Sequence, residues 1–308
     1  MVEHTKNHIP VLLRETLQGL ALTPDRTVID ATLGSGGHFS AILSELGKRG
    51  TLLGIDADST AIAQAQERFK PHTHSPRVLF ATDNFRNITK IAKEQGITSV
   101  HAIVADLGWR SEQFLGDKKS GGGKGFSFAI EEPLLMTFGD PVSYAFTARD
   151  IINSWREDDL VNVLKGYGEE RYAQSIAHAI VVRRETRPIK TSAELAEIVN
   201  SAVPSRYQHG RIHPATKTFQ ALRIAVNDEL EALQEFIESA STFLSSDGRL
   251  AVISFHSIED RIVKHTMRAL ETEGRVRRIT KKPITPTNEE IQANPRSRSA
   301  KLRIIEKI

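Results

Sequence analysis

Short apolar runs alternate with helix-like segments through the first third of the chain. The runs are rich in β-branched and aliphatic residues, which is typical of buried parallel strands. Between them, apolar residues recur at helical spacing. Such alternation predicts an α/β fold with a parallel sheet, whose ligands bind at the carboxyl ends of the strands. The expected strands are 28–29, 52–56, 78–80 and 102–106, and the expected helices are 8–20, 39–46, 59–69 and 88–95.

The pattern changes after residue 140. Only helical periodicity is found from about 144 to 203, and strand-like runs return after Pro214. Thr191 and Glu194 have the spacing of a capping box, which predicts a helix start. We therefore expect a discontinuous sheet domain, 1–140 and 213–308, with an inserted helical domain, 141–212. The later elements are expected as helices at 148–155, 157–164, 171–183, 192–199 and 218–243, and as strands at 249–255, 275–279 and 301–306.

A glycine-rich turn follows the first strand. Asp30 ends that strand, and Gly34, Gly36 and Gly37 precede the next helix. Such a turn brings backbone N–H groups and a helix N-terminus close to a ligand. Asp56 ends the second strand 22 residues after Gly34, where a carboxylate can bind ribose hydroxyls.

Three interpretations of this turn remain open. It can be a structural turn without a ligand, a dinucleotide site, or a site for a cationic nucleoside such as S-adenosylmethionine. A carboxylate at Asp30 would repel a pyrophosphate, whereas it would attract a sulfonium and an ammonium group. Charge therefore favours S-adenosylmethionine over NAD.

Two further strand ends carry candidate chemistry. Asp106 follows the fourth strand, where amino-group methyltransferases hold the substrate amine by accepting its N–H bonds. The alternative is an acid that caps a loop. His256 follows the fifth strand and would face the same cleft as a base or a hydrogen-bond donor. Its alternative is a structural histidine.

Composition limits the possible chemistry. The chain has 308 residues, 39% of them hydrophobic, and no cysteine. The absence of cysteine excludes disulfides, thiolate metal sites and a cysteine nucleophile. Methylation of pyrimidine C5 ordinarily uses such a nucleophile, so a nitrogen or oxygen target is expected. No apolar run reaches the roughly 20 residues of a membrane span, and residues 1–6 lack a signal-peptide core, so we expect a cytoplasmic protein.

Positive charge is concentrated towards the C-terminus. Residues 261–308 hold 13 Lys and Arg against 5 Asp and Glu, a local net charge of +8. This basic tail suits nucleic acid, and an ordinary solvated surface is the alternative. A cluster around Arg183 and Arg184 is open to the same two interpretations. The glycine-rich segment 118–125 is expected to be a flexible loop, since it lacks the residue order of a P-loop.

Taken together, motifs along nearly the whole chain resemble the bacterial 16S ribosomal RNA cytosine-N4 methyltransferases of the MraW type. Any one of these motifs is weak, but all of them occur in the order that the family shows. They are residues 8–13, 30–38, 54–58, 106–108, 125–128, 167–170, 219–224, 254–261 and 294–303.

The resemblance implies a class I S-adenosylmethionine-dependent methyltransferase fold with a helical insertion. It implies direct SN2 methylation of cytidine N4 in the decoding centre, without a metal ion or a covalent enzyme adduct. The partner would be 16S rRNA or the 30S subunit, and a homodimer is possible.

By motif match, the resemblance places Gly36, Gly37 and His38 at the methionine end of the cofactor, Asp56 at the ribose, Phe85 at the adenine, and Asp106 with Gln113 completing the cofactor site at the edge of the target-base pocket. We predict that Asp106 orients the amine and that His256 or a nearby water assists proton loss. We expect Arg183, Arg184, Ser257, Arg296 and Arg298 to contact substrate RNA.

The chain departs from the family pattern in one region. Residues 109–113 differ from the usual small apolar residue followed by two serines. About five residues are added before Phe126, and Leu135 and Thr137 replace a usual acid and arginine. Two rival functions follow. The chain could bind rRNA and S-adenosylmethionine without turnover, or it could be an NAD-dependent oxidoreductase, which Asp30 argues against.

Overall fold

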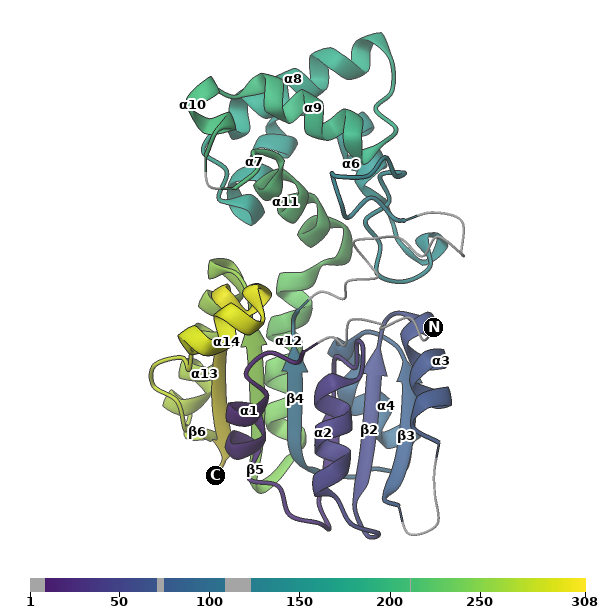
Figure 1. Ribbon diagram of the computed structural model, residues 1–308, viewed down its shortest axis with the longest axis vertical. Coiled ribbons are helices and arrows are strands. Elements are labelled where there is room, and N and C mark those ends of the chain that lie inside the picture. The colour runs from purple at the N-terminus through teal and green to yellow at the C-terminus, as the bar shows by residue number, and fades with distance from the viewer. Residues whose placement is uncertain (1–8, 71–74, 109–122, 211) are drawn as a thin grey trace. The chain divides into compact units, whose positions relative to one another are not determined.

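The computed structural model describes residues 9–70, 75–108, 123–210 and 212–308. Contacts divide the chain into two compact units. One comprises Met1–Gly108 with Leu230–Ile308 and is called the sheet unit below, and the other comprises Trp109–Glu229 and is called the helical unit. In Figure 1 the sheet unit combines the purple and blue N-terminal part of the chain with the light-green and yellow C-terminal part.

The sheet unit is built on a seven-stranded sheet with the order β3-β2-β1-β4-β5-β7-β6. The first five strands, β1, β2, β3, β4 and β5, are parallel to one another in the sheet. β7 pairs antiparallel with both β5 and β6. The strand order reverses between β1 and β4, and ligands bind at such a switch point in open α/β sheets. The strands are β1 Thr27–Asp30, β2 Thr51–Asp56, β3 Arg77–Thr82, β4 Val100–Asp106, β5 Leu244–Ser254, β6 Val276–Arg278 and β7 Lys301–Lys307.

Helices cover both faces of this sheet (Figure 1). Successive residues of a strand point to opposite faces, so Val28 and Ile29 contribute to different cores. α1, α2 and α3 pack on the Val28 side, and α4, α12 and α13 pack on the Ile29 side. The expected α/β fold is confirmed. The elements are α1 Leu13–Leu20, α2 Gly37–Glu45, α3 Ser59–Arg68, η1 Phe85–Asn87, α4 Ile88–Glu94, α12 Glu229–Phe243, α13 Ser257–Thr272, α14 Asn288–Ala293 and η3 Pro295–Ser299.

The helical unit has its own hydrophobic core. The core is formed by the apolar faces of α6, α7, α8, α9 and α11. Phe126, Leu134 and Met136, which precede these helices, are buried in the same core. The unit therefore extends beyond the range 141–212 expected from periodicity. Its elements are η2 Pro141–Ser143, α6 Ala148–Ser154, α7 Glu157–Gly168, α8 Ala173–Thr186, α9 Ser192–Ala202, α10 Ser205–Gln208 and α11 Ala215–Asn227.

The single helix expected over 218–243 is wrong, because two helices occupy this range. Asp228 ends α11 with φ of 49° and ψ of 41°, which is left-handed backbone that no α-helix can continue through. α12 then starts at Glu229. The apolar spacing runs through the break, so periodicity alone did not reveal it. Within the described residues, we find no helix that is long and apolar enough to cross a membrane.

Candidate active site

Four aspartates lie at the carboxyl ends of four neighbouring strands. In the order of the sheet they are Asp83 after β3, Asp56 on β2, Asp30 on β1 and Asp106 on β4. The strands are parallel, so these carboxylates lie along one edge of the sheet. This row gives the edge a strongly anionic character and suits a positively charged ligand.

The glycine turn is held tightly by its neighbours. Gly36 adopts φ of 73°, which favours glycine, and a Cβ there would lie 2.8 Å from the ring of Phe69. A Cβ on Gly37 would lie 2.5 Å from Pro10 Cγ. Protein packing thus requires both glycines. α2 starts at Gly37, and the first N–H groups of a helix have no intrahelical partner. The N–H of Phe39 is directed to Asp30, and those of Gly37 and His38 lie before it in the same turn.

Asp56 connects the second strand to the glycine turn. Its Oδ2 accepts the N–H of Gly34 at 2.8 Å, and its Oδ1 accepts the N–H of Asp58 at 2.9 Å. The carboxylate is half-buried. The two backbone N–H groups therefore orient the carboxylate at the end of β2.

Asp30 is almost completely buried, with 1% of its surface exposed. Its Oδ1 accepts the N–H of Thr32 at 3.2 Å, and its Oδ2 is a buried oxygen without a hydrogen-bond partner among the described residues. Burial raises the pKa of Asp30 to about 7, and the carboxylates of Asp106 and Asp56 contribute to this rise. The N–H groups of Thr32 and Phe39 oppose it. A buried, incompletely satisfied carboxyl group fits a cationic ligand and disfavours a pyrophosphate.

Asp106 is supported from three sides. Its backbone N–H donates to the Thr32 hydroxyl at 2.6 Å, and its Oδ1 accepts the N–H of Gly108 at 3.0 Å. Its Oδ2 lies 3.4 Å from Nδ1 of His38. The other ring nitrogen of His38 lies 3.1 Å from the carbonyl oxygen of Val11. The carboxylate is therefore held in one orientation at the end of β4.

His38 thus contacts the protein on both ring nitrogens. It is 6% exposed, and its two ring nitrogens lie beside the Asp106 carboxylate and the Val11 carbonyl oxygen. The resemblance places His38 at the methionine end of the cofactor. Its side chain lies between Asp106 and the Val11 carbonyl oxygen, and its place at the methionine end stays a prediction. Thr32, which sequence reasoning missed, also supports Asp106, and no spacing pattern pointed to it.

His256 lies at the N-terminus of α13. Its Nδ1 accepts the N–H of Glu259, and the Glu259 side chain accepts the N–H groups of Phe255 and His256. The two residues form a capping box. Because Nδ1 is an acceptor, Nε2 carries the proton of the neutral ring, and it lies 2.9 Å from Glu259 Oε1. The cap thus uses Nδ1, whereas Nε2, apart from this contact, is a buried atom without a hydrogen-bond partner among the described residues, and the catalytic role of His256 stays a prediction. Glu259, 4% exposed, was missed because the pattern drew attention to the histidine.

Phe85 and Gln113 are the remaining residues predicted to bind the cofactor, and the structure describes only Phe85. Phe85 starts η1, half-buried, and its ring contacts Phe236 edge-on at 5.1 Å. The ring therefore packs against α12, and its place beside the adenine stays a prediction. Gln113 lies outside the described residues, as does the altered segment 109–113. Thr137, one of the altered positions, is fully buried in the helical unit, where its hydroxyl donates to the Gly139 carbonyl.

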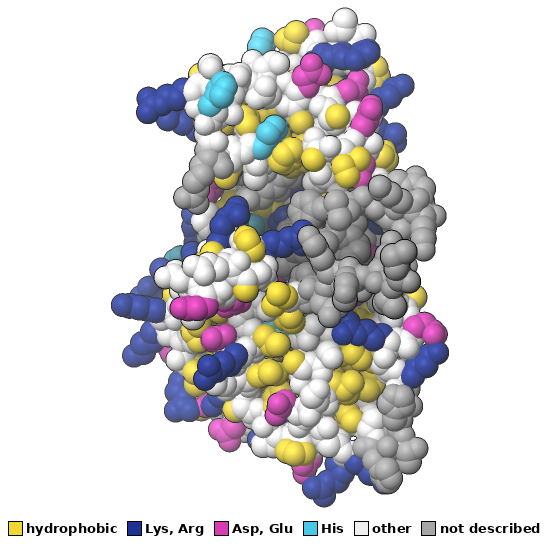
Figure 2. Space-filling view, in the orientation of Figure 1, with side chains coloured by type: hydrophobic (Ala, Val, Ile, Leu, Met, Phe, Trp, Pro, Cys, Tyr) yellow, Lys and Arg dark blue, Asp and Glu magenta, His cyan; other side chains and the backbone are white. Residues whose placement is uncertain are grey.

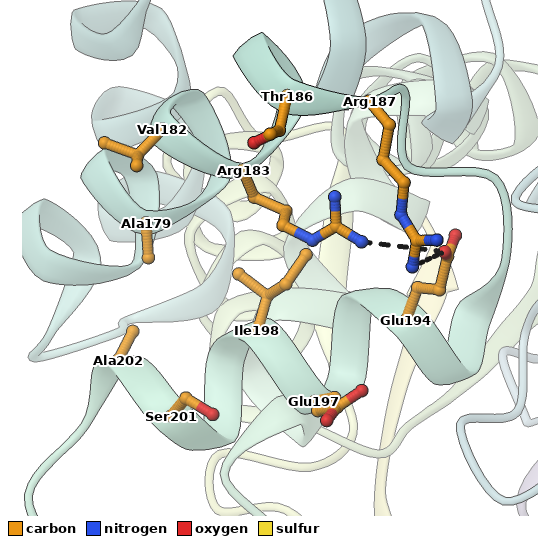
Figure 3. A pocket seen from close by; sticks show the side chains of 10 residues that line it. All are labelled: Ala179, Val182, Arg183, Thr186, Arg187, Glu194, Glu197, Ile198, Ser201 and Ala202. Carbon is orange, nitrogen blue, oxygen red and sulfur yellow. Dashed lines mark hydrogen bonds and ion pairs between the residues drawn. The ribbon is translucent and has the colours of Figure 1, made fainter.

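The arginines of α8 have different surroundings. Arg184 donates to the carbonyl oxygens of Ile152 at 2.7 Å and Trp155 at 2.6 Å, so its guanidinium group supports the helical core. Arg183 and Arg187 line a groove of about 560 Å³ between α8 and α9. Figure 3 shows both guanidinium groups directed towards Glu194, at 4.0 and 3.1 Å. With Glu197 also lining the groove, its charge is balanced, which gives phosphate little attraction.

The cations of the basic tail fall into two groups. Arg303 and Lys301 bind the carboxylate of Asp260, and Arg277 binds Glu306, so these side chains stabilise the sheet unit. Arg296 and Arg298 are exposed in η3, and Ser257 is exposed at the start of α13. In Figure 2 the lysine and arginine side chains of the visible face are scattered and do not form one patch.

No grouping of three or more His, Cys, Asp or Glu residues suited to a metal ion occurs within residues 9–70, 75–108, 123–210 and 212–308. The aspartate row is engaged by backbone N–H groups and by His38. This donor set suits an organic cation whose polar groups complete the bonds.

Comparison with known proteins identifies the family. The model of the MraW methylase family matches residues 5–308. The chain is 47% identical over 304 residues to the ribosomal RNA small subunit methyltransferase H of Synechococcus elongatus, covering 98% of this chain and 95% of that protein. The enzyme of the same name from Clostridium botulinum is 42% identical over 316 residues, covering 98% and 99%.

A solved structure is similar over most of its length. It is a putative rRNA methylase from Clostridium thermocellum, with 16% identity and a TM-score of 0.45, covering 98% of this chain and 100% of that chain. The family model and the curated relatives cover nearly the whole sequence. The chain therefore belongs to the MraW methylase family, whose methyl donor is S-adenosylmethionine.

Proposed function

We propose that this protein transfers a methyl group from S-adenosylmethionine to N4 of a cytidine in 16S rRNA. The observation that carries the proposal is the row of carboxylates beside the glycine turn, with the oriented Asp106 at one end. The names of the relatives, ribosomal RNA small subunit methyltransferase H, support the substrate class. The position of Asp106 supports a further part of the proposal, namely that the methyl acceptor is the exocyclic amine of cytosine.

In this proposal the sheet unit holds the cofactor through three groups. The first turn of α2 and the glycine turn bind its carboxylate, because helix N-termini attract anions. Asp56 accepts the ribose hydroxyls. The buried carboxyl group of Asp30 balances the positive charge of the cofactor. When bound, S-adenosylmethionine supplies an electrophilic methyl group on a cationic sulfur.

Asp106 then positions the cytosine amine. Its carboxylate accepts an N–H of the amine and directs the nitrogen lone pair towards the methyl group. His38 and Gly108 hold the carboxylate in place, and Thr32 holds the backbone of Asp106. The amine loses one proton as it gains the methyl group, and this proton passes to water beside Asp106. His256 is given a structural role in this proposal, since its Nδ1 caps α13.

Holding two reactants in line can contribute roughly 7–11 kcal/mol to lowering a barrier. A supported carboxylate supplies such positioning without a covalent adduct. The target base is proposed to be unstacked and single-stranded, since a base in a duplex presents its amine to its pairing partner.

The test is transfer of tritiated methyl groups to unmethylated 30S subunits, followed by nucleoside analysis. We expect label in N4-methylcytidine, and a single-turnover rate about 100-fold lower or worse for Asp106→Asn at saturating S-adenosylmethionine. Asp25→Asn, an exposed carboxylate paired with Arg49, is the matched control and should leave the rate unchanged.

The outcomes separate the parts of the proposal. Label on another nucleoside would reject cytosine N4 as the target atom. Binding of S-adenosylmethionine without transfer to 30S subunits or free rRNA would reject the enzymatic function. NAD binding in place of S-adenosylmethionine would reject the cofactor.

A further inference from the structure

An aromatic stack extends from the core of the helical unit to solvent. Phe219, 5% exposed, is buried in that core, and the ring of Phe128 contacts it edge-on at 5.3 Å. His213 then lies over Phe128, with the ring centroids 4.4 Å apart and an angle of 19° between the rings. Phe128 is half-buried and His213 is exposed. The outermost ring of the stack is therefore presented to solvent and held by rings beneath it.

The orientation of His213 is also fixed from its edge. Its Nδ1 accepts the N–H of Ala215 at 3.1 Å, at the start of α11. A ring clamped by a hydrogen bond and by a parallel aromatic neighbour loses little further freedom when a ligand stacks on it. Folding therefore provides a flat, rigid and accessible surface.

The charge of the surrounding segment suits an anionic polymer. Residues 198–227 contain four Lys and Arg residues, two histidines and no Asp or Glu. Of these cations, Arg223 pairs with Glu229, and Lys217 donates to the Glu169 carbonyl.

Proteins commonly bind single-stranded nucleic acid with exposed aromatic rings in a positively charged region. The bases stack on the rings, and the cations attract the phosphates. If His213 had only a structural role, the hydrogen bond to Ala215 would be enough, and its ring would not need an exposed face.

We propose that the Phe128–His213 stack is a platform on which the helical unit stacks one unpaired base of its RNA substrate. This inference rests on the proposed rRNA substrate and adds a base-binding site to it. The base is recognised by its π-face and so without strict sequence preference. Its stacking would keep a single-stranded segment of the substrate from moving freely.

Two substitutions separate stacking from capping. In His213→Asn the side-chain oxygen can accept the N–H of the residue two positions on, so the cap is retained and the ring is lost. In His213→Phe the ring is retained and the acceptor is lost. His209→Asn is the matched control, since His209 is exposed in the same segment and its ring bonds the Ser205 carbonyl at 2.8 Å.

The measurement is the affinity of the full-length variants for a short, fluorescently labelled single-stranded oligoribonucleotide. We expect His213→Asn to weaken binding by about fivefold or more, while His213→Phe stays within about twofold of wild type. His209→Asn should bind as wild type does. Thermal melting of each variant reports on the cap, and here His213→Phe is expected to be the less stable of the two.

Equal RNA affinity of His213→Asn and wild type would overturn the platform. The same holds if His213→Phe binds as weakly as His213→Asn, because the loss would then follow the cap. Wild-type binding and methyl transfer are measured first: if wild type methylates 30S subunits while the His213 variants match it, only the platform fails. If wild type neither binds RNA nor transfers a methyl group, the proposed function fails and the platform with it.

Discussion

The negative charge of Asp30 is unfavourable in the free protein because the carboxyl group is buried. A bound cation would stabilise this charge. Burial of Asp30, and the neighbouring carboxylates of Asp106 and Asp56, raise its pKa to about 7. Its buried Oδ2 has no hydrogen-bond partner among the described residues. In the free protein the group therefore changes protonation near neutral pH. A cationic ligand stabilises the charged form and lowers this pKa, so ligand binding and proton release are linked.

The affinity for S-adenosylmethionine is accordingly expected to rise with pH. Below a pH of about 7 the cofactor must displace a proton from Asp30, which weakens binding by up to roughly tenfold per pH unit. Asp30→Asn should bind more weakly at about pH 8 and show a flatter dependence. Calorimetric titrations between about pH 6 and pH 8 measure this. The neutral thioether product, S-adenosylhomocysteine, is the control and should depend less on pH. Identical profiles for wild type and variant would exclude Asp30.

The same pKa has a consequence for stability. A folded-state pKa above the unfolded value contributes stability that is fully present below the unfolded pKa of about 4 and is lost as pH rises through about 7. Without cofactor, Asp30→Asn should therefore resist heat at least as well as wild type at about pH 8, where wild type contains the buried charge.

Among the helices and strands, the break between α11 and α12 differs most from what the sequence pattern predicts. Asp228 is the one residue between them, and its left-handed backbone ends one helix before the next begins. Asn and Asp tolerate this conformation better than most residues, and glycine adopts it freely. The apolar positions on both sides continue at helical spacing because each helix packs into a core of its own.

A pair of substitutions tests the break. Both Asp228→Gly and Asp228→Ala remove the carboxylate, so they differ mainly in backbone preference. Left-handed backbone predicts that the glycine variant is the more stable by about 1 kcal/mol, or a few degrees in Tm. A continuous helix would reverse this order, because alanine is the better helix former by a similar amount. Thermal melting of the two variants therefore gives opposite results for the two structures.

At the scale of the molecule, the cations of the basic tail, residues 261–308, have two kinds of surroundings. Several of its cations are bound within the fold, as Arg303 and Lys301 are by Asp260. Others are exposed, and Lys264 and Arg268 lie one turn apart on α13. α13 starts directly after the end of β5, at the carboxyl edge of the sheet. Lys264 and Arg268 lie roughly 10 and 16 Å along α13 from that edge, so these exposed cations would contact RNA phosphates outside the proposed site.

Neutralising two of these cations should change the salt dependence of RNA binding. The double variant Lys264→Gln/Arg268→Gln is expected to lower the slope of log K against log salt by about 1 for each RNA phosphate that is no longer neutralised. Lys48→Gln/Lys93→Gln is the matched control, since both lysines are exposed where α2 and α4 lead into the amino ends of β2 and β4. Equal slopes for the two double variants would assign RNA binding to another surface.

The sequence by itself determined the elements and the family. Apolar periodicity located the strands and nearly all the helices, because a period of two or 3.6 residues reports directly on burial. Asp30, Asp56 and Asp106 were recognised at strand ends, and parallel strands necessarily place such ends along one edge. The motifs, taken together along the chain, pointed to the MraW methylases, and the family model confirms that membership.

Only the tertiary structure decided what each polar side chain contacts. Arg184 donates hydrogen bonds to two carbonyl groups. His38 lies beside the carboxylate of Asp106, and His256 caps a helix. Phe128 and His213, 85 positions apart in the sequence, became a stack only once the helical unit was folded. Periodicity reports which face of an element is buried, whereas the partner of a hydrogen bond or a ring depends on which distant residue the fold brings within about 3 to 5 Å.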